Sequence, residues 1–376
     1  MGLFDRRSFL RATGASGIAA LAGCSSLSGG GSGNNELNKL GFTSYVRGGS
    51  WITAYVEAAK FYSKDQDIEI DVRPNQQSAS KQVQDIRDFV NKGYDAILVG
   101  VWQTGAAKDA IQYALDKDVP VIATNADTAN ENIPMYVGFS NYEGGEKSGE
   151  QMVKYLKEQN SGGKPWQVLN IRGPQGNQSA NQRSQGFLDV IEQASGVEVA
   201  DTINGEFAQD TAQNKVQQWV NNNGTPDGIY SGNLSMGLGV YKALKNLDIL
   251  YKADNENHVT LTQMDGSPQV NPLVKQGYID AAVDQPNYFY NPLAIHYLQK
   301  VVKNGDSAVP DVGTQIAKAD LDIPSSKHKG VDLWSKSIWA PAEVKKQNGH
   351  PWFKTNSIVI TNENADKPFL WGNVWG

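Results

Sequence analysis

Short apolar runs alternate with longer amphipathic segments along most of the chain. Residues 38–45 and 68–74 are short and apolar or alternating, which is typical of strands. Residues 51–64 and 78–93 place apolar side chains three and four positions apart, which is typical of helices that bury one face. The alternation continues to residue 305, so the pattern predicts parallel sheets with helices on both faces.

The remaining predicted elements follow the same order. Further strands are expected at residues 94–101, 119–125, 135–139, 166–171, 197–203, 226–232, 258–264 and 279–285. Further helices are expected at residues 104–118, 142–159, 179–194, 210–223, 235–247 and 290–305. Residues 93–115 and 225–244 share one order of turn, buried strand, polar tip and helix, which suggests two domains of like topology.

We therefore predict an α/β protein of two doubly wound parallel-sheet domains of similar topology, joined by three hinge crossovers. The crossovers are expected near Phe139, near Gln285 and within residues 313–356. The N-terminal lobe is predicted to comprise residues 37–139 and 286–318, and the C-terminal lobe residues 140–285 and 357–376. Residues 319–356 are polar with little periodicity, and we interpret them as an insertion that packs its aromatic side chains on the body. The alternative is a lid over a ligand.

The N-terminus carries the pattern of an export signal. Arg6 and Arg7 precede a short apolar run without a carboxylate, and this run ends at Cys24, the only cysteine of the chain. The residues after Cys24 are small, polar and rich in glycine, which favours a flexible tether. We predict an export signal over residues 1–23, and a lipidated Cys24 with its tether over residues 24–36.

Two short motifs support this interpretation. "RRSFL" resembles the twin-arginine export motif, although Asp5 stands where a serine or threonine is usual, and "LAGC" resembles a lipobox. The alternative is a disordered N-terminus with a chance cysteine. On the lipoprotein interpretation the mature protein is anchored to the outer face of the cytoplasmic membrane.

The charge of the chain argues against a nucleic-acid partner. The formal net charge is −6, and loss of residues 1–23 removes three arginines and one aspartate, which brings it to −8. A protein that binds nucleic acid needs a basic face. No apolar stretch after residue 24 approaches the length of a bilayer span, so we expect a soluble body, and we expect it to be a monomer.

The segments that follow the predicted strands have a common composition. They are rich in Asn, Gln, Asp and Arg, and they include Trp51, Trp102 and Phe207. In an open parallel sheet, ligands bind at the carboxyl ends of the strands. Amide, carboxylate and guanidinium groups can each bond two neighbouring hydroxyls, and an aromatic ring covers the apolar face of a sugar. Loops are polar in any protein, but the agreement of five or six tips favours a neutral polyol such as a sugar.

The segments that follow these strands also resemble those of a known family. From about residue 40 to residue 305 it resembles the periplasmic ribose-binding family of sugar-binding proteins that serve ABC importers, in the segments "VPVIATNAD", "RSQGF", "SGNLSMGLGVYKAL", "MDGSP" and "AAVDQPNYFYNPLA". "SIVITNENAD" is similar to the last strand of that family. The resemblance implies a type I periplasmic binding protein that closes around a neutral monosaccharide, a pentose or a hexose, and delivers it to an ABC permease.

The resemblance also implies a ligand site. Its members would be Trp51, Asn125, Asp127, Arg183, Phe207, Asn233, Asp265 and Gln285. Two positions depart from the family pattern: Ile52 stands where a second aromatic residue is common, and Asn125–Ala126 replaces an Asp-Arg pair, with Asp127 one position further on. These departures leave the identity of the sugar open.

Five of the predicted site residues have an alternative interpretation. Trp51 could anchor the first helix in the core, Arg183 could pair with Asp189 on the surface, Asn233 could be glycosylated in its "NLS" sequon, Asp265 could form a turn, and Gln285 could end a strand.

The sequence disfavours an enzyme. Its four histidines are scattered, and it has no HExxH, GxSxG or GxGxxG motif, so no nucleophile, base or cofactor fingerprint is evident. No His, Asp or Glu cluster has the spacing of metal ligands, and we expect no metal or cofactor. A sensor of the same fold, which would bind a nucleoside or a furanosyl signal, remains an alternative, because transport and sensing share one sequence pattern.

Overall fold

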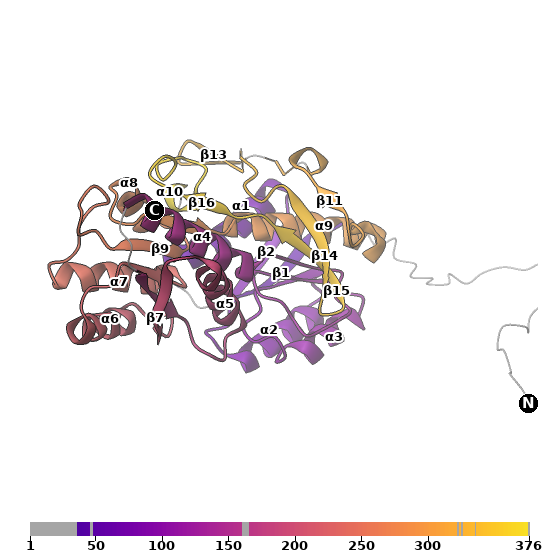
Figure 1. Cartoon of the computed structure of the whole chain (residues 1–376). Coiled ribbons are helices and arrows are strands. Elements are labelled where there is room, and N and C mark those ends of the chain that lie inside the picture. The colour runs from indigo at the N-terminus through magenta and orange to yellow at the C-terminus, as the bar shows by residue number, and fades with distance from the viewer. Residues whose placement is uncertain are drawn as a thin grey trace, which may run out of the picture. The chain divides into compact units, whose positions relative to one another are not determined.

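The computed structural model describes residues 36–45, 48–159, 165–321, 323–324, 326–334 and 336–374. The predicted signal and tether, with Arg6, Arg7 and Cys24, lie outside the described residues. The described residues form one compact unit, which is built on an eight-stranded sheet and a six-stranded sheet (Figure 1). The short strands β12 (Ser326–His328) and β13 (Val331–Leu333) form a separate two-stranded sheet.

The eight-stranded sheet defines the N-terminal lobe. Its strand order is β11-β14-β15-β5-β4-β3-β1-β2, in which the six strands from β15 to β2 are parallel and β14 and β11 are antiparallel. The strands are β1 (Lys39–Ser44), β2 (Glu69–Pro74), β3 (Ala96–Val99), β4 (Val121–Thr124), β5 (Met135–Phe139), β11 (Gln315–Ile316), β14 (Ala342–Gln347) and β15 (His350–Thr355). The helices of this lobe are α1 (Ser50–Asp65), α2 (Ala79–Asn91), α3 (Lys108–Leu115) and α9 (Asn287–Asn304), and two 3-10 turns follow α9 at Asp306–Ala308 and Lys318–Asp320.

The six-stranded sheet defines the C-terminal lobe. Its order is β16-β10-β9-β8-β6-β7, and all pairs are parallel except that of β16 with β10. The strands are β6 (Trp166–Arg172), β7 (Val197–Asn204), β8 (Gly228–Ser231), β9 (Thr260–Met264), β10 (Ala281–Asp284) and β16 (Ile358–Ile360). The helices are α4 (Asn141–Gln159), α5 (Gln178–Gln193), α6 (Gln209–Asn223), α7 (Leu234–Asn246), α8 (Val270–Lys275) and α10 (Trp371–Val374).

The chain passes between the two sheets three times. It leaves the N-terminal sheet after β5 and enters α4, which packs on α5, β9 and β10. It returns after β10 into α9, which packs on α1 and on β3, β4 and β5. The last passage joins β15 to β16. The predicted fold class, two parallel-dominated α/β lobes with three crossovers, is confirmed.

Burial and helix capping explain why these segments form these elements. The parallel strands β3 and β4 are buried at every position, because helices cover both faces of their sheet, and they accordingly read as continuous apolar runs. Side chains of Ser78, Asn177 and Asn233 cap helices α2, α5 and α7 by accepting a hydrogen bond from a backbone N–H three residues further on. Each cap directly follows the loop at a strand tip, so the caps fix the loops that face the space between the lobes.

The C-terminal region differs from the prediction. Residues 319–356 were expected to form an insertion with little periodicity, but they contain β14 and β15 (Figure 1), which extend the N-terminal sheet because β15 pairs with β5. Asn348 and Gly349 join these strands with φ angles of 47° and 93°, the conformation of a tight hairpin turn that Asn-Gly sequences favour. Trp339 is buried in the core, in accord with the expected aromatic packing, whereas Trp352 lines a cavity.

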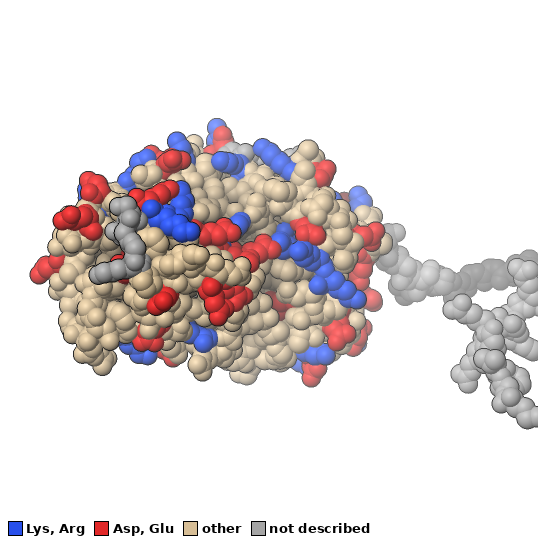
Figure 2. Space-filling model, viewed as in Figure 1, with Lys and Arg blue, Asp and Glu red and all other residues tan. Residues whose placement is uncertain are grey.

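The surface of the body is of mixed charge. Acidic and basic side chains are interspersed over the face shown in Figure 2. Among the described helices, none has the length and apolar character needed to cross a bilayer.

The close packing of α4 on α5 predicts a strong effect at Gly186. A Cβ atom at this position would lie 2.1 Å from the carbonyl oxygen of Tyr142, which is backbone and cannot rotate away. We expect Gly186→Ala to lower the free energy of unfolding by about 1–3 kcal/mol, measured by urea denaturation. Gly105→Ala is the matched control, because no atom lies within 4 Å of its Cβ position, and it should change stability by less than about 0.5 kcal/mol. Equal stability of the two variants would contradict this packing.

Candidate functional site

The carboxyl ends of both sheets face one cleft. The cleft has two cavities, which we call the Arg183 chamber, of about 400 Å³, and the Trp352 chamber, of about 830 Å³. Both chambers are lined by loops that follow strands, as the parallel topology requires. The two chambers share a wall that includes Trp102, Asn125, Asn177, Ser179 and Phe207, so they form one continuous site.

Seven of the eight predicted site residues lie together in the Arg183 chamber. They are Trp51, Asn125, Arg183, Phe207, Asn233, Asp265 and Gln285. They come from both lobes and from seven different loops or helix starts, between residues 51 and 285 of the chain. Asp127 lies in the Trp352 chamber instead.

Arg183 is the central cation of the first chamber. It extends from α5, and only 7% of its surface is exposed. Its Nε donates to Asn141 Oδ1 at 2.8 Å, its Nη1 donates to the Gly232 carbonyl at 3.0 Å, and Nη1 lies 3.7 Å from Asp265 Oδ2. Nη2 has no hydrogen-bond partner among the described residues, so it can donate to a ligand. The predicted alternative, a pair with Asp189, is not formed, since Asp189 accepts from Tyr142 and Gln185.

Asp265 balances the charge of Arg183. Its Oδ1 accepts from Gln285 Nε2 at 2.7 Å, and its Oδ2 accepts a long hydrogen bond from the Leu234 backbone N–H at 3.4 Å. Gln285 Oε1 accepts in turn from the Tyr290 hydroxyl. Because a buried carboxylate and a buried guanidinium offset each other, the chamber has no net charge to attract an ionic ligand.

An aromatic cluster forms the opposite wall. Trp51 stacks on Tyr55, with ring centroids 5.2 Å apart and an angle of 25° between the planes, and it meets Tyr45 edge-on. Burial raises the pKa of Tyr45 well above its usual range, so its hydroxyl keeps its proton. That hydroxyl accepts from Asn125 Nδ2 at 2.9 Å and donates to the Val101 carbonyl, which orients the amide at the edge of the chamber. Trp51 is therefore part of the wall and also anchored in the core.

Three of the predicted site residues in the chamber have left-handed backbone conformations. The φ angles of Asn125, Phe207 and Asp265 are 66°, 54° and 70°. Residues with a Cβ rarely adopt this region, and such strain clusters at ligand sites. The Phe207 ring is also held close to the chain at Gly173, where a Cβ would lie 2.3 Å from a ring carbon. These strained tips aim their side chains into the cleft.

A family comparison agrees with this geometry. Residues 40–306 match the model of the periplasmic binding protein domain, which is more than two thirds of the chain. The chain belongs to the periplasmic binding protein family. Members of this family bind solutes and are not enzymes.

Individual relatives of this periplasmic binding protein are distant. It is 23% identical to the galactofuranose-binding protein of Escherichia coli over 293 residues, which cover 76% of this chain and 88% of that protein. It is 24% identical to a ribose import binding protein of Haemophilus influenzae, over 62% of this chain and 74% of that protein. Among solved structures, a solute-binding protein of Actinobacillus succinogenes with bound D-allose matches with a TM-score of 0.69 and 17% identity, over 88% of this chain and 99% of that chain.

Asp127 has a structural role in this periplasmic binding protein. Its Oδ1 accepts from the Thr128 backbone N–H and lies 2.8 Å from His350 Nε2. Its Oδ2 accepts from Gln347 Nε2 and from Asn348 Nδ2, both at 2.8 Å. A carboxylate offers about four lone-pair positions, and all are used here. Asp127 therefore ties the β14–β15 hairpin to the tip of β4, which differs from the ligand contact we predicted for it.

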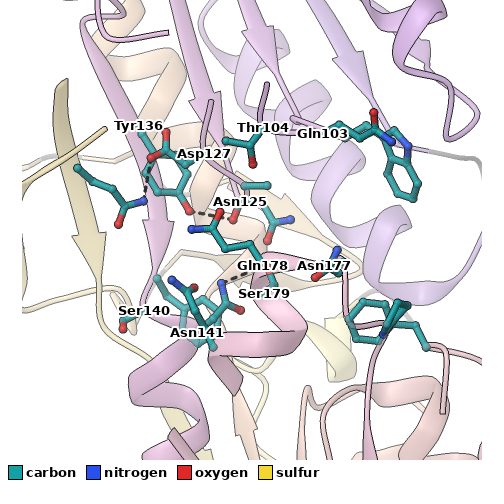
Figure 3. Close-up of a pocket in the computed structure, with 18 of the residues that line it drawn as sticks. Gln103, Thr104, Asn125, Asp127, Tyr136, Ser140, Asn141, Asn177, Gln178 and Ser179 are labelled. Atoms are coloured by element: carbon teal, nitrogen blue, oxygen red, sulfur yellow. Dashed lines mark hydrogen bonds between the residues drawn. The ribbon is translucent and has the colours of Figure 1, made fainter. Parts of the chain in front are cut away.

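Sequence reasoning missed several residues of the cleft. Tyr136, Asn141, Gln347 and Trp352 line the Trp352 chamber, and Figure 3 shows Tyr136 and Asn141 on its wall. Trp352 lies in the region we interpreted as an insertion. The Asn348–Gly349 turn was the signal that could have placed it, because that dipeptide between alternating runs is a strong hairpin indicator.

Asp284 lies directly behind the site at the second crossover. It is fully buried, and its Oδ1 accepts from Trp371 Nε1 at 2.8 Å and from the Gly266 backbone N–H at 3.0 Å. Its Oδ2 has no hydrogen-bond partner among the described residues. Burial raises the pKa of this carboxyl to about 8, from an ordinary value of 3.8. The carboxyl is therefore mainly protonated in the folded protein at neutral pH.

The raised pKa of Asp284 predicts a pH-dependent stability. In the unfolded chain this carboxyl ionises near pH 3.8, so the stability that its neutral form contributes is complete below that pH and is lost as the pH rises to about 8. We expect Asp284→Asn to flatten the fall of unfolding free energy over this interval, measured by urea denaturation across the pH series. Asp67→Asn, at an exposed position, should leave the slope unchanged. A slope that Asp284→Asn does not alter would refute this assignment.

Proposed function

We propose that this periplasmic binding protein is the substrate-binding component of an ABC importer, and that it captures a neutral monosaccharide, a pentose or a hexose, in the Arg183 chamber. The observation that carries the proposal is the mutually neutralised Arg183–Asp265 pair, which faces an aromatic wall containing Trp51 across a chamber of about 400 Å³. Such a chamber offers hydrogen bonds in several directions and an apolar face, but no net charge.

The named relatives support a sugar as ligand. These relatives are named as binding proteins for galactofuranose, ribose, apiose and xylitol, which are all uncharged and hydroxylated. These ligands differ in carbon number and in their ring form, and xylitol is acyclic. In addition, Asn125–Ala126 departs from the Asp-Arg pair of the family that the chain resembles. The proposal is therefore limited to the class of neutral sugars.

Binding would proceed by hinge closure. A sugar in the chamber contacts Asn125 and Trp51 from one lobe and Arg183 and Asp265 from the other, so it stabilises the state in which the lobes meet. Closure expels water and strengthens each polar contact. A dissociation constant of about 1 µM corresponds to about 8 kcal/mol, which six to eight hydrogen bonds of about 1 kcal/mol and two aromatic contacts could supply after the cost of closing.

We also propose that Arg6 and Arg7 belong to an export signal and that Cys24 carries lipid. The glycine- and serine-rich tether would then hold the binding body near a permease on the outer face of the cytoplasmic membrane. The support for this part is the order of motifs in the sequence.

The site assignment predicts a loss of affinity at two positions. We expect Arg183→Ala and Asp265→Ala each to weaken sugar binding by at least about tenfold, because each removes a ligand contact and leaves its partner unpaired. Titration calorimetry measures the affinity for the tightest ligand of a panel of pentoses, hexoses and polyols. Arg87→Ala is the control, because that guanidinium lies over the Tyr113 ring and lines neither chamber. Wild-type affinity in both site variants, with both folded, would defeat the assignment.

The anchor proposal makes a separate prediction. Expressed in a bacterium with the lipoprotein pathway, the wild-type chain should incorporate a labelled fatty acid and sediment with membranes, and Cys24→Ser should do neither. Replacement of Ser25 by alanine is the control and should keep the label. Labelling that persists in Cys24→Ser would show that Cys24 is not the lipid acceptor.

A further inference from the structure

The Trp352 chamber is too large to be an accessory of a one-ring site. The Arg183 chamber alone, at about 400 Å³, lies within the range of pockets that bury small ligands. The Trp352 chamber adds about 830 Å³ beside it, across the shared wall of Trp102 and Phe207. A single sugar ring in the Arg183 chamber would leave this second space filled only with water.

The second chamber has its own aromatic surface. Trp352 lines it from β15, and its indole Nε1 donates to the Gly138 carbonyl at 2.9 Å. The Trp352 ring stacks on Tyr136, with centroids 6.0 Å apart and planes at 23°. The ring is therefore fixed in orientation before any ligand arrives, which is what an aromatic platform for a sugar ring requires.

Unpaired amide groups surround this platform. The side chains of Gln103, Gln178 and Gln182 make no hydrogen bond to another described residue, although each lines the chamber. Figure 3 shows Gln103 and Gln178 on its wall, from opposite lobes. Among the described residues that line the chamber, none is Lys or Arg. Its two carboxylates are that of Asp127, which is already saturated, and that of Glu206, which is exposed and accepts from Asn204 Nδ2. This lining suits a neutral hydroxylated group and not a phosphate or a carboxylate.

The space is not explained by a gap between separated lobes. Ser50 of the N-terminal lobe lies 3.4 Å from Gln269 Oε1 of the C-terminal lobe, and Lys354 pairs with Glu143 across the lobes beside the third crossover. Trp352 and Tyr136 lie on β15 and β5, two of the three strands that lead directly into crossovers. Both rings belong to one sheet and lie near the crossovers, so their stacked surface is kept when the lobes close.

We propose that the Trp352 chamber is a second sugar subsite, so that the preferred ligand is a glycoside or disaccharide. Its first ring occupies the Arg183 chamber, its glycosidic link passes the shared wall at Trp102, and its second ring stacks on Trp352. This inference rests on the proposed function, because it takes the Arg183 chamber as the site of the first ring.

The test compares one-ring and two-ring ligands on the full chain. A calorimetric panel of free sugars identifies the tightest monosaccharide, and both anomers of its methyl glycoside and its commercially available disaccharides are then titrated. We expect at least one disaccharide to bind about tenfold tighter than the free sugar. Trp352→Leu should remove that gain and leave the affinity for the free sugar within about twofold. Trp219→Leu, on α6 and outside both chambers, is the matched control.

A second variant covers a loss of folding in Trp352→Leu. The double substitution Gln178→Ala with Gln182→Ala removes two amides of the same chamber without touching a core contact, and it should also reduce the disaccharide gain. If every disaccharide binds no tighter than the free sugar, the second subsite is wrong while the proposed function stands. If Arg183→Ala leaves sugar binding intact, or no sugar binds at all, the proposed function fails and the subsite fails with it.

Discussion

The buried pair of Arg183 and Asp265 is the interaction on which the candidate site depends. Arg183 also bonds Asn141, which begins the helix after the first crossover, and Asp265 accepts from Gln285, which lies in the second crossover. One network of hydrogen bonds and an ion pair thus connects the Arg183 chamber to two of the three crossovers. Two opposite charges can be buried in this way only because each is surrounded by further polar partners, and removal of either would leave an expensive unpaired charge.

The topology explains why this network faces a cleft. Parallel strands end on one edge of their sheet, and the two lobes present these edges to each other. The loops there are released from sheet pairing, so they can adopt left-handed conformations such as those of Asn125 and Asp265. Helix caps at Asn177 and Asn233 then fix the start of the next helix, so each loop has a defined position within its lobe.

The C-terminal hairpin enlarges this arrangement. The β14–β15 hairpin is tied to the β4 tip through Asp127, and β15 pairs with β5. A carboxylate at a strand tip has here become a structural anchor, and the hairpin it holds contributes Trp352 to the cleft. The same polar residue types can therefore bind a ligand or stabilise the fold. Which role a side chain has depends on whether protein groups already occupy its hydrogen-bonding positions.

The sequence by itself determined the alternation of strands and helices, the two-lobed class, and seven residues that converge on the Arg183 chamber. The elements and the two-lobed class follow from local periodicity. The seven residues were taken from the resemblance to the ribose-binding family, and they fall at strand tips, which meet in a parallel sheet. Only the tertiary structure decided what Asp127 bonds to and that Trp352 lies beside Tyr136 of β5, because both depend on pairing between segments more than two hundred positions apart. Strand register across such separations is set by packing of the complete core, which no local pattern contains.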